Sequence, residues 1–187
     1  PLYHWSHLEL QRYFGYNGIL NGDTAEEVWN LCNAKLQEDS MSVRNLIKQS
    51  NVTLVCTTDD PVDSLEWHKV LAEDKTFDVK VLPAWRPDKA MAVDNTKNFA
   101  EYVNKLGEVA GVSIAKFQDM IDALQKRHDF FHENGCRLSD HGIEEFYDEP
   151  YTDSQIEIIF EKAMRGQELT QQEIHQLKHC MHTIFAE

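Results

Sequence analysis

The stretch VTLVCTTDDP, residues 52–61, is a run of β-branched and apolar residues that ends in two aspartates and a proline. Such a run is typical of a strand that is buried on both faces, and we expect a strand over residues 52–57. A second run, DVKVLPAW at residues 78–85, and a third, CRLSDH at residues 136–141, have the same character. Helical patterns separate the three runs, which predicts β-α-β units and a parallel sheet.

Apolar residues recur every three or four positions between and around these strands, which is the spacing of one helix face. Two expected helix starts carry a capping box, in which a Thr and a Glu three residues later satisfy each other's backbone N–H groups: Thr24 with Glu27, and Thr170 with Glu173. We expect helices within residues 1–22, after Thr24, at 42–49, from Pro61 onward, at 96–109, at 113–133, from Asp153 and from Thr170.

The composition is that of a soluble globular protein of 187 residues, with 32 acidic and 18 basic side chains and a net charge of −14. A surface this negative repels nucleic acid and anionic lipid, so we expect neither as a partner. No apolar run approaches the roughly 20 residues that span a bilayer. The four cysteines are scattered, which favours reduced thiols and a cytoplasmic location.

The two ends of the sequence suggest a piece of a longer polypeptide. The chain opens on Pro1, inside an aromatic and histidine-rich segment, and stops at Glu187 within an amphipathic helix that has no glycine cap. We therefore expect that further catalytic groups lie outside these residues.

Arg86 is the strongest candidate for ligand binding. Ligands of parallel sheets bind beyond the carboxyl ends of the strands, and Arg86 follows the second strand directly. Its guanidinium is a rigid fork of donors that matches a carboxylate or phosphate. Alternation along the strand puts Arg86 and Trp85 on opposite faces. The alternative is an ion pair of Arg86 with Asp59, Asp60 or Asp88.

Four further polar residues lie at strand ends: Asp59, Asp60, Asp140 and His141. A carboxylate there could be a general base, a metal ligand or an acceptor for a hydroxyl group, and an imidazole could move a proton. The alternative for Asp60 is an N-cap of the helix expected from Pro61. Adjacent residues of a strand point to opposite faces, so only Asp140 or His141 can reach one site by that route.

His175, His179 and His182 share one face of the last helix, a spacing that in other proteins can bind zinc. The glutamate of an HExxH motif is absent, so we expect a solvated or partner-facing stripe instead of a zinc site. The sequence also has no GxGxxG, P-loop, GxSxG or CxxC motif.

Four segments together are similar to one family. PLYHWSHLELQRYFG (1–15), VCTTDDPVDSLEWH (55–68), KVLPAWRPDKA (80–90) and GCRLSDH (135–141) resemble, in this order and spacing, the uronate isomerase (glucuronate isomerase) family. That family belongs to the amidohydrolase superfamily of (β/α)₈ barrels.

The resemblance implies an α/β fold: a partial (β/α)₈ TIM barrel of about three parallel strands with many helices. Residues 1–50 would be an inserted helical segment and residues 51–187 the partial barrel. It implies that Arg86, with Trp85 beside it, holds the substrate, and that Asp59, Asp60, Asp140 and His141 occupy catalytic strand-end positions.

The resemblance also implies a cytoplasmic enzyme of hexuronate catabolism that interconverts D-glucuronate with D-fructuronate and D-galacturonate with D-tagaturonate. Its partner would be the small-molecule hexuronate. Family members use one divalent metal, usually zinc. We expect no metal site within this chain, because the residues that match the family's metal ligands would lie outside it.

Two other functions remain open from the residues: a non-catalytic sugar-acid binding module and a metal-dependent hydrolase of the same superfamily. We expect the isolated chain to be inactive as an isomerase. We also expect it to self-associate, because strands 52–57 and 136–139 would have unpaired edges and Leu54, Leu82 and Leu138 would lack neighbours.

Overall fold

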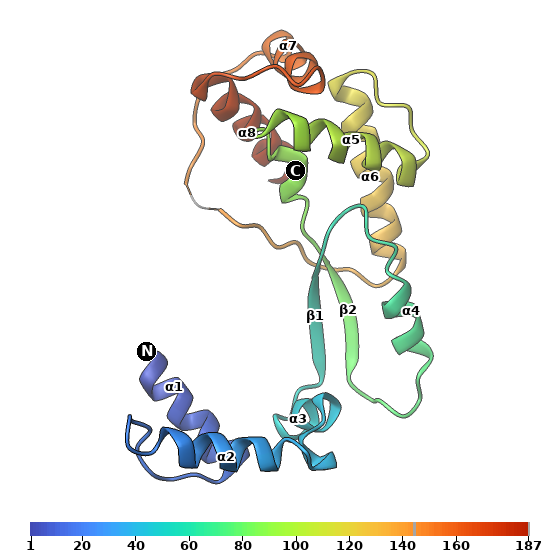
Figure 1. Cartoon of the computed structure of the whole chain (residues 1–187). Helices are drawn as coiled ribbons and strands as arrows, with labels where there is room; N and C mark the ends of the chain where they lie inside the picture. Colours follow the sequence, from blue (N-terminus) through green and yellow to red (C-terminus); the bar gives the residue numbers. More distant parts are fainter. Residues whose placement is uncertain (144, 187) are drawn as a thin grey trace. The chain divides into compact units, whose positions relative to one another are not determined.

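The structure, a computed structural model, describes residues 1–143 and 145–186 and is an α/β structure with many helices (Figure 1). Two compact units make up the chain: one of residues 1–55 and 75–80, and one of residues 56–74 and 81–187. Because both units are discontinuous in sequence, the division into residues 1–50 and 51–187 stays a prediction.

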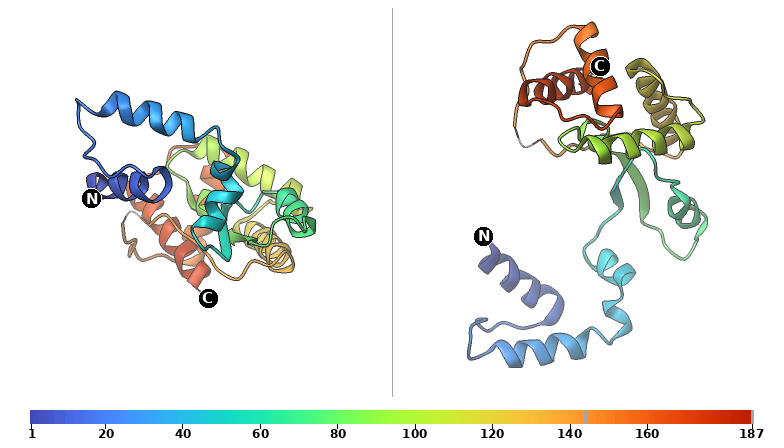
Figure 2. Two further views of the ribbon diagram at one scale, coloured as in Figure 1. Left: turned by 90° about the horizontal axis from the view of Figure 1, so that it is seen from below. Right: turned by 45° about the horizontal axis from the view of Figure 1, so that its top comes forward.

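The first unit contains short helices. They are α1 (Leu2–Glu9), a π-helical turn η1 (Leu10–Phe14), α2 (Ala25–Lys35), η2 (Asp39–Met41) and α3 (Val43–Gln49). Figure 2 shows the loop that joins η1 to α2. The predicted helices within residues 1–22 and at 42–49 are confirmed. The capping box at Thr24 is wrong, because the Thr24 hydroxyl donates to the Ile19 carbonyl, at 2.7 Å, and forms no side-chain cap of α2.

Strands β1 (Leu54–Asp59) and β2 (Lys80–Trp85) form a two-stranded sheet. The amide of Lys80 donates to the Thr53 carbonyl at 3.2 Å, and the amide of Arg86 donates to the Asp59 carbonyl at 3.0 Å. The sequence offset is the same at both ends of the pairing, so the strands are parallel. The prediction of parallel strands is thus confirmed for these two.

The predicted third strand over residues 136–141 is wrong in its extent. This segment makes one parallel bridge, between Ser139 and Trp85. The Trp85 amide donates to the Leu138 carbonyl at 3.1 Å, and the Asp140 amide donates to the Trp85 carbonyl at 2.9 Å. Only Cys136 and Leu138 are apolar here, too few to bury a longer strand, but the bridge still brings Asp140 to the carboxyl end of β2.

The helix expected from Pro61 begins later, since α4 covers Glu66–Glu73. Residues 60–65 form a turn instead, in which the Asp60 amide donates to the Asp63 carboxylate at 2.8 Å. The buried Arg127 of α6 clamps this turn by donating to the carbonyls of Pro61, at 2.7 Å, and Asp63, at 2.8 Å. The N-cap alternative for Asp60 is therefore wrong.

The helices of the second unit pack around one apolar core. The long ones are α5 (Thr96–Ala110), α6 (Phe117–Glu133), α7 (Asp153–Met164) and α8 (Gln171–Ala186), with the 3₁₀ turn η3 (Asp88–Met91) after β2. Helix α5 packs on α6 and α7, and α7 packs on α8 (Figure 1). Phe99, Phe131 and Phe160 are at most 1% exposed. Among the described residues, no helix is long and apolar enough to cross a membrane.

Most helix boundaries in this unit follow the predictions. The capping box at Thr170 is confirmed, because the Thr170 amide donates to Glu173 at 2.8 Å and the Glu173 amide donates to the Thr170 hydroxyl at 3.2 Å. Helix α6 begins at Phe117 instead of residue 113. The Asp119 carboxylate accepts from the amides of Ala115, at 2.9 Å, and Lys116, at 3.0 Å, and so holds a turn before the helix.

The packing of aromatic rings at the centre of this core predicts how much a substitution there should destabilise the fold. Phe160 meets Phe99 and Phe117 edge to face, with ring centroids 6.2 and 5.9 Å apart. Replacing a buried Phe by Ala leaves a cavity and costs about 3–5 kcal/mol. We expect Phe160→Ala to lower the free energy of unfolding by this amount in urea denaturation.

The matched control is Phe146→Ala, because the Phe146 side chain is 95% exposed. This control should change the free energy of unfolding by less than about 0.5 kcal/mol. Equal losses in the two variants would contradict the placement of the core.

Candidate functional site

Arg86 lies at the carboxyl end of β2 and is held by two carboxylates. Its Nε donates to Asp88 Oδ2 at 2.9 Å, and its Nη1 lies 3.4 Å from Asp140 Oδ2. The side chain is 37% exposed, and the hydrogen bond to Asp88 raises the pKa of Arg86 above its ordinary value. Of the alternatives for Arg86, the ion pair with Asp88 is therefore present.

Asp88 is the junction of this site. Its carboxylate also accepts from the amide of Gly142, at 2.8 Å, and lies 3.2 Å from Nδ1 of His141. Burial by itself would raise the pKa of Asp88, but the hydrogen bonds from Arg86, Gly142 and His141 together lower it. Asp88 therefore stays ionised at neutral pH. From the sequence, Asp88 was considered only as an ion-pair partner for Arg86. Its position two residues after the arginine was the feature that could have indicated its wider role.

Asp140 and His141 both join this cluster. The strand alternation allowed only one of them, but the chain leaves its single bridge at Ser139, and both side chains can then turn to the same side. Asp140 contacts Arg86, whereas His141 contacts Asp88. The His141 ring is also stacked on Phe185, with centroids 5.7 Å apart and planes 20° apart.

Gly142 leaves the space that the guanidinium occupies. A Cβ atom built on Gly142 would lie 2.7 Å from Nη2 of Arg86, closer than such atoms come to each other. A side chain at this position would therefore require the guanidinium of Arg86 to shift. We name the group Arg86, Asp88, Asp140, His141 and Gly142 the strand-end cluster.

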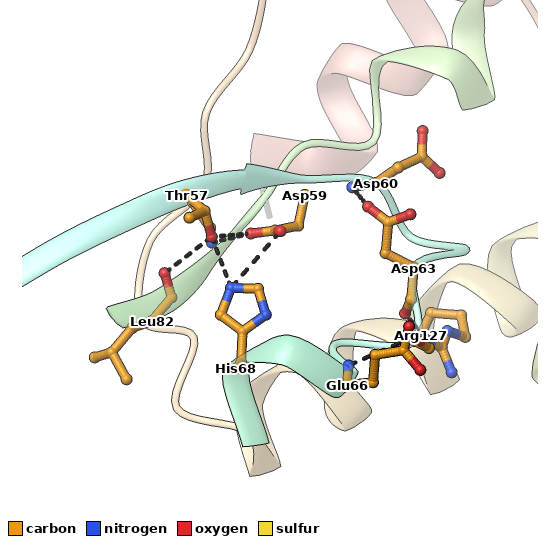
Figure 3. Close-up of polar contacts among 10 residues, drawn as sticks. Thr57, Asp59, Asp60, Asp63, Glu66, His68, Leu82 and Arg127 are labelled. Carbon is orange, nitrogen blue, oxygen red and sulfur yellow. Dashed lines mark hydrogen bonds and ion pairs between the residues drawn. The ribbon is translucent and has the colours of Figure 1, made fainter. Parts of the chain in front are cut away.

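Asp59 and Asp60 lie outside the strand-end cluster. The Asp59 carboxylate points toward α4, where it contacts Thr57 and His68 (Figure 3). Asp60 accepts from the Tyr102 hydroxyl at 3.0 Å and pairs with Lys89 at 3.2 Å. Burial, and next the Asp60 charge, raise the pKa of Tyr102. Catalytic roles for Asp59 and Asp60 stay predictions, and neither His68 nor Tyr102 was singled out from the sequence.

Trp85 is a core residue on the helical side of the sheet. It is 6% exposed, and its ring meets the rings of His128 and Phe131 edge to face, at 5.3 and 5.0 Å. It also lines a cavity of about 260 Å³, together with Ser139 and His141 among others. Its contact with a substrate stays a prediction.

The histidine stripe of α8 is half-buried, so the solvated alternative is wrong, whereas the partner-facing alternative stays a prediction. His179 Nδ1 lies 2.9 Å from the Glu149 carbonyl oxygen, and the His182 ring stacks on Tyr147 with centroids 5.7 Å apart. His175 meets the same tyrosine edge to face. Burial, and next the nearby His141, lower the pKa of His182.

Metal ligands are not grouped in the part of the chain that the structure describes. Within residues 1–143 and 145–186, no three His, Cys, Asp or Glu side chains are placed to hold one ion. The three α8 histidines are instead engaged with the segment from Glu145 to Tyr151. These residues do not fit the divalent metal that the family resemblance implies.

Comparisons with known proteins find relatives of this chain in one family. A family model described as glucuronate isomerase matches residues 1–187. The uronate isomerase of Lachnospira eligens is 66% identical over 178 residues, which are 95% of this chain and 38% of that protein. The uronate isomerase of Bacteroides thetaiotaomicron is 54% identical over 187 residues, 100% of this chain and 40% of that protein.

A solved structure has the same fold. The crystal structure of uronate isomerase from Thermotoga maritima superposes with a TM-score of 0.87 at 39% sequence identity, over 99% of this chain and 40% of that one. The chain thus spans about 40% of the length of the relatives that it matches. The match over all 187 residues shows that this chain belongs to the glucuronate isomerase family.

Proposed function

We propose that the whole protein is a uronate isomerase that interconverts D-glucuronate with D-fructuronate and D-galacturonate with D-tagaturonate. Family membership supports this function. The observation that carries it in this chain is Arg86, a partly exposed cation held at the carboxyl end of β2. That edge is where ligands of parallel α/β sheets bind.

Arg86 is suited to the carboxylate of a hexuronate. Asp88 takes the Nε–H group and so fixes the plane of the guanidinium. Nη2 has no hydrogen-bond partner among the described residues. Nη1 makes one ion pair, with Asp140 at 3.4 Å, and no hydrogen bond to a described residue. These outer nitrogens are the pair that a carboxylate binds bidentately. A local cation also offsets the net charge of −14, which would repel an acidic sugar.

His141 and Asp140 are suited to the proton transfers of an aldose–ketose isomerisation. The reaction moves a proton from C2 to C1 and a hydroxyl proton from O2 to O1. Asp88 lies 3.2 Å from Nδ1 of His141, and Nε2 of the ring, which has no hydrogen-bond partner among the described residues, is available to move a proton. The Asp140 carboxylate is an acceptor for a sugar hydroxyl, and Asp60 is a second carboxylate after β1.

Four wider proposals rest on the family resemblance. We infer that β1, β2 and residues 136–139 are successive strands of a (β/α)₈ barrel, of which residues 51–187 form a part. Residues 1–50 are then an inserted helical segment. The divalent metal, zinc by resemblance, takes its ligands from outside the described residues. The enzyme is cytoplasmic.

Arg86→Lys in the whole protein tests the proposed function. Lysine keeps the charge but loses the planar fork, so a two-point contact with the carboxylate becomes a single one. Losing one charged hydrogen bond of about 1.5–3 kcal/mol should lower kcat/KM for D-glucuronate roughly ten- to a hundred-fold. The melting temperature should change little, because the side chain is partly exposed.

The matched control is Arg165→Lys. Arg165 pairs with Glu161 on the surface of α7 and is 67% exposed, so its replacement should leave both kinetics and melting unchanged. Near-wild-type kinetics of Arg86→Lys would end the assignment of this residue to the substrate. The 187-residue chain alone should be inactive.

We propose further that the isolated chain self-associates. Among the described residues, β1 has no strand on the edge away from β2. Leu54 is 47% exposed and Leu138 is 46% exposed. Unpaired edges and exposed apolar residues favour pairing with a second copy. Light scattering after size exclusion should give a mass above 21.7 kDa at high protein concentration.

A charge beside the sheet should weaken this association. We expect Leu138→Lys to shift the mass toward the monomer, whereas Val43→Lys, at a position that is 74% exposed on α3, should not. A wild-type chain that stays monomeric at crystallisation concentrations would contradict the proposal.

A further inference from the structure

Asp59 bridges the two strands through both its backbone and its side chain. Its carbonyl oxygen accepts from the Arg86 amide at 3.0 Å, and its Oδ2 accepts from the Ala84 amide at 3.2 Å. Ala84 and Arg86 are alternate residues, so their side chains lie on the same face of β2. One residue of β1 therefore holds the backbone of β2 at Arg86 and two residues before it.

A hydrogen-bond relay holds the Asp59 carboxylate in place. The Thr57 hydroxyl donates to Asp59 Oδ2 at 2.6 Å and lies 2.7 Å from His68 Nε2 (Figure 3). A hydroxyl has one proton, and the short bond to the carboxylate takes it, so the hydroxyl accepts from His68. The Thr57–Leu82 contact, at 3.3 Å, is the weaker alternative for that proton. The relay thus runs from His68 to Thr57 to Asp59.

The groups of this relay are largely buried. The side chains of His68 and Asp59 are 13% and 12% exposed. His68 Nδ1 is buried and has no hydrogen-bond partner among the described residues.

The Asp59 carboxylate also faces away from the strand-end cluster. Thr57 and Asp59 point toward α4 in Figure 3. Thr58, the residue between them, points the other way, and its hydroxyl is 3.5 Å from Asp140. Alternation along β1 therefore separates Asp59 from the face that carries Arg86 and Asp140.

We propose that Asp59 is a positioning residue for Arg86, held by Thr57 and His68, and that its carboxylate takes no part in proton transfer. This inference rests on the proposed function, because the position of Arg86 matters for a uronate only if Arg86 binds it. It assigns His68 a role that no sequence pattern indicated.

Asp59→Asn and Asp59→Ala in the whole protein separate positioning from proton transfer. Both bonds of the carboxylate to Thr57 and Ala84 end on one oxygen, and the amide oxygen of Asn can accept both. We expect kcat/KM of Asp59→Asn to stay within about tenfold of the wild type, since a neutral acceptor replaces a charged one. Asp59→Ala should lower it by on the order of a hundredfold.

Coupling to Arg86 provides a second readout. If Asp59 acts through Arg86, Asp59→Ala should cost much less in an Arg86→Lys background than in the wild type. The matched control is Asp94→Ala, which removes a surface carboxylate paired with Lys178 at 2.7 Å and should leave kcat/KM unchanged. A folded Asp59→Asn variant without turnover would overturn the inference, even if Asp59→Ala fails to fold.

Amide hydrogen exchange distinguishes failure of this inference from failure of the proposed function. A wild-type whole protein that does not isomerise uronates would refute the function alone. In the 187-residue chain, the amides of Ala84 and Arg86 should still exchange faster in Asp59→Ala and at the wild-type rate in Asp59→Asn. Unchanged exchange in Asp59→Ala would refute the positioning role.

Discussion

The hydrogen bond from the Arg86 amide to the Asp59 carbonyl, at 3.0 Å, closes the pairing of β1 with β2 and fixes where both strands end. Everything in the strand-end cluster follows from that register. A slip of one residue would turn the Arg86 side chain toward α6 and bring Trp85 out of the core. The Trp85 backbone then adds the segment of Leu138 and Asp140 on its other side, so one short sheet collects charged groups from three distant stretches of sequence.

Asp88 links these charged groups into one cluster. Its carboxylate accepts from Arg86, His141 and Gly142, and these three bonds outweigh the burial that would otherwise raise its pKa. A charged junction of this kind fixes the orientation of the guanidinium and of the imidazole, as the proposed binding of a sugar carboxylate and the proposed proton transfer require. The aspartates therefore differ in the direction of their side chains: Asp88 and Asp140 lie with Arg86, whereas Asp59 lies between the sheet and α4.

Local patterns predicted much of the fold but less of the site. The helices at 96–109 and from Thr170, two strands, and the position of Arg86 at the carboxyl end of β2 could all be inferred from period, caps and strand ends. The turn after Pro61 could not, because Arg127, more than sixty residues later, holds it. The same is true of the half-buried histidines, whose partners Tyr147 and Glu149 lie in an irregular segment, and of His68, whose role depends on a contact across two elements.

The most direct test of this account is a crystal structure of the whole protein with D-glucuronate bound. The account predicts the sugar carboxylate within hydrogen-bond distance of Nη1 and Nη2 of Arg86, with Nε still on Asp88 and the Asp59 carboxylate still on Thr57 and Ala84. A sugar carboxylate bound elsewhere, or an Asp59 side chain turned to contact the sugar, would contradict it.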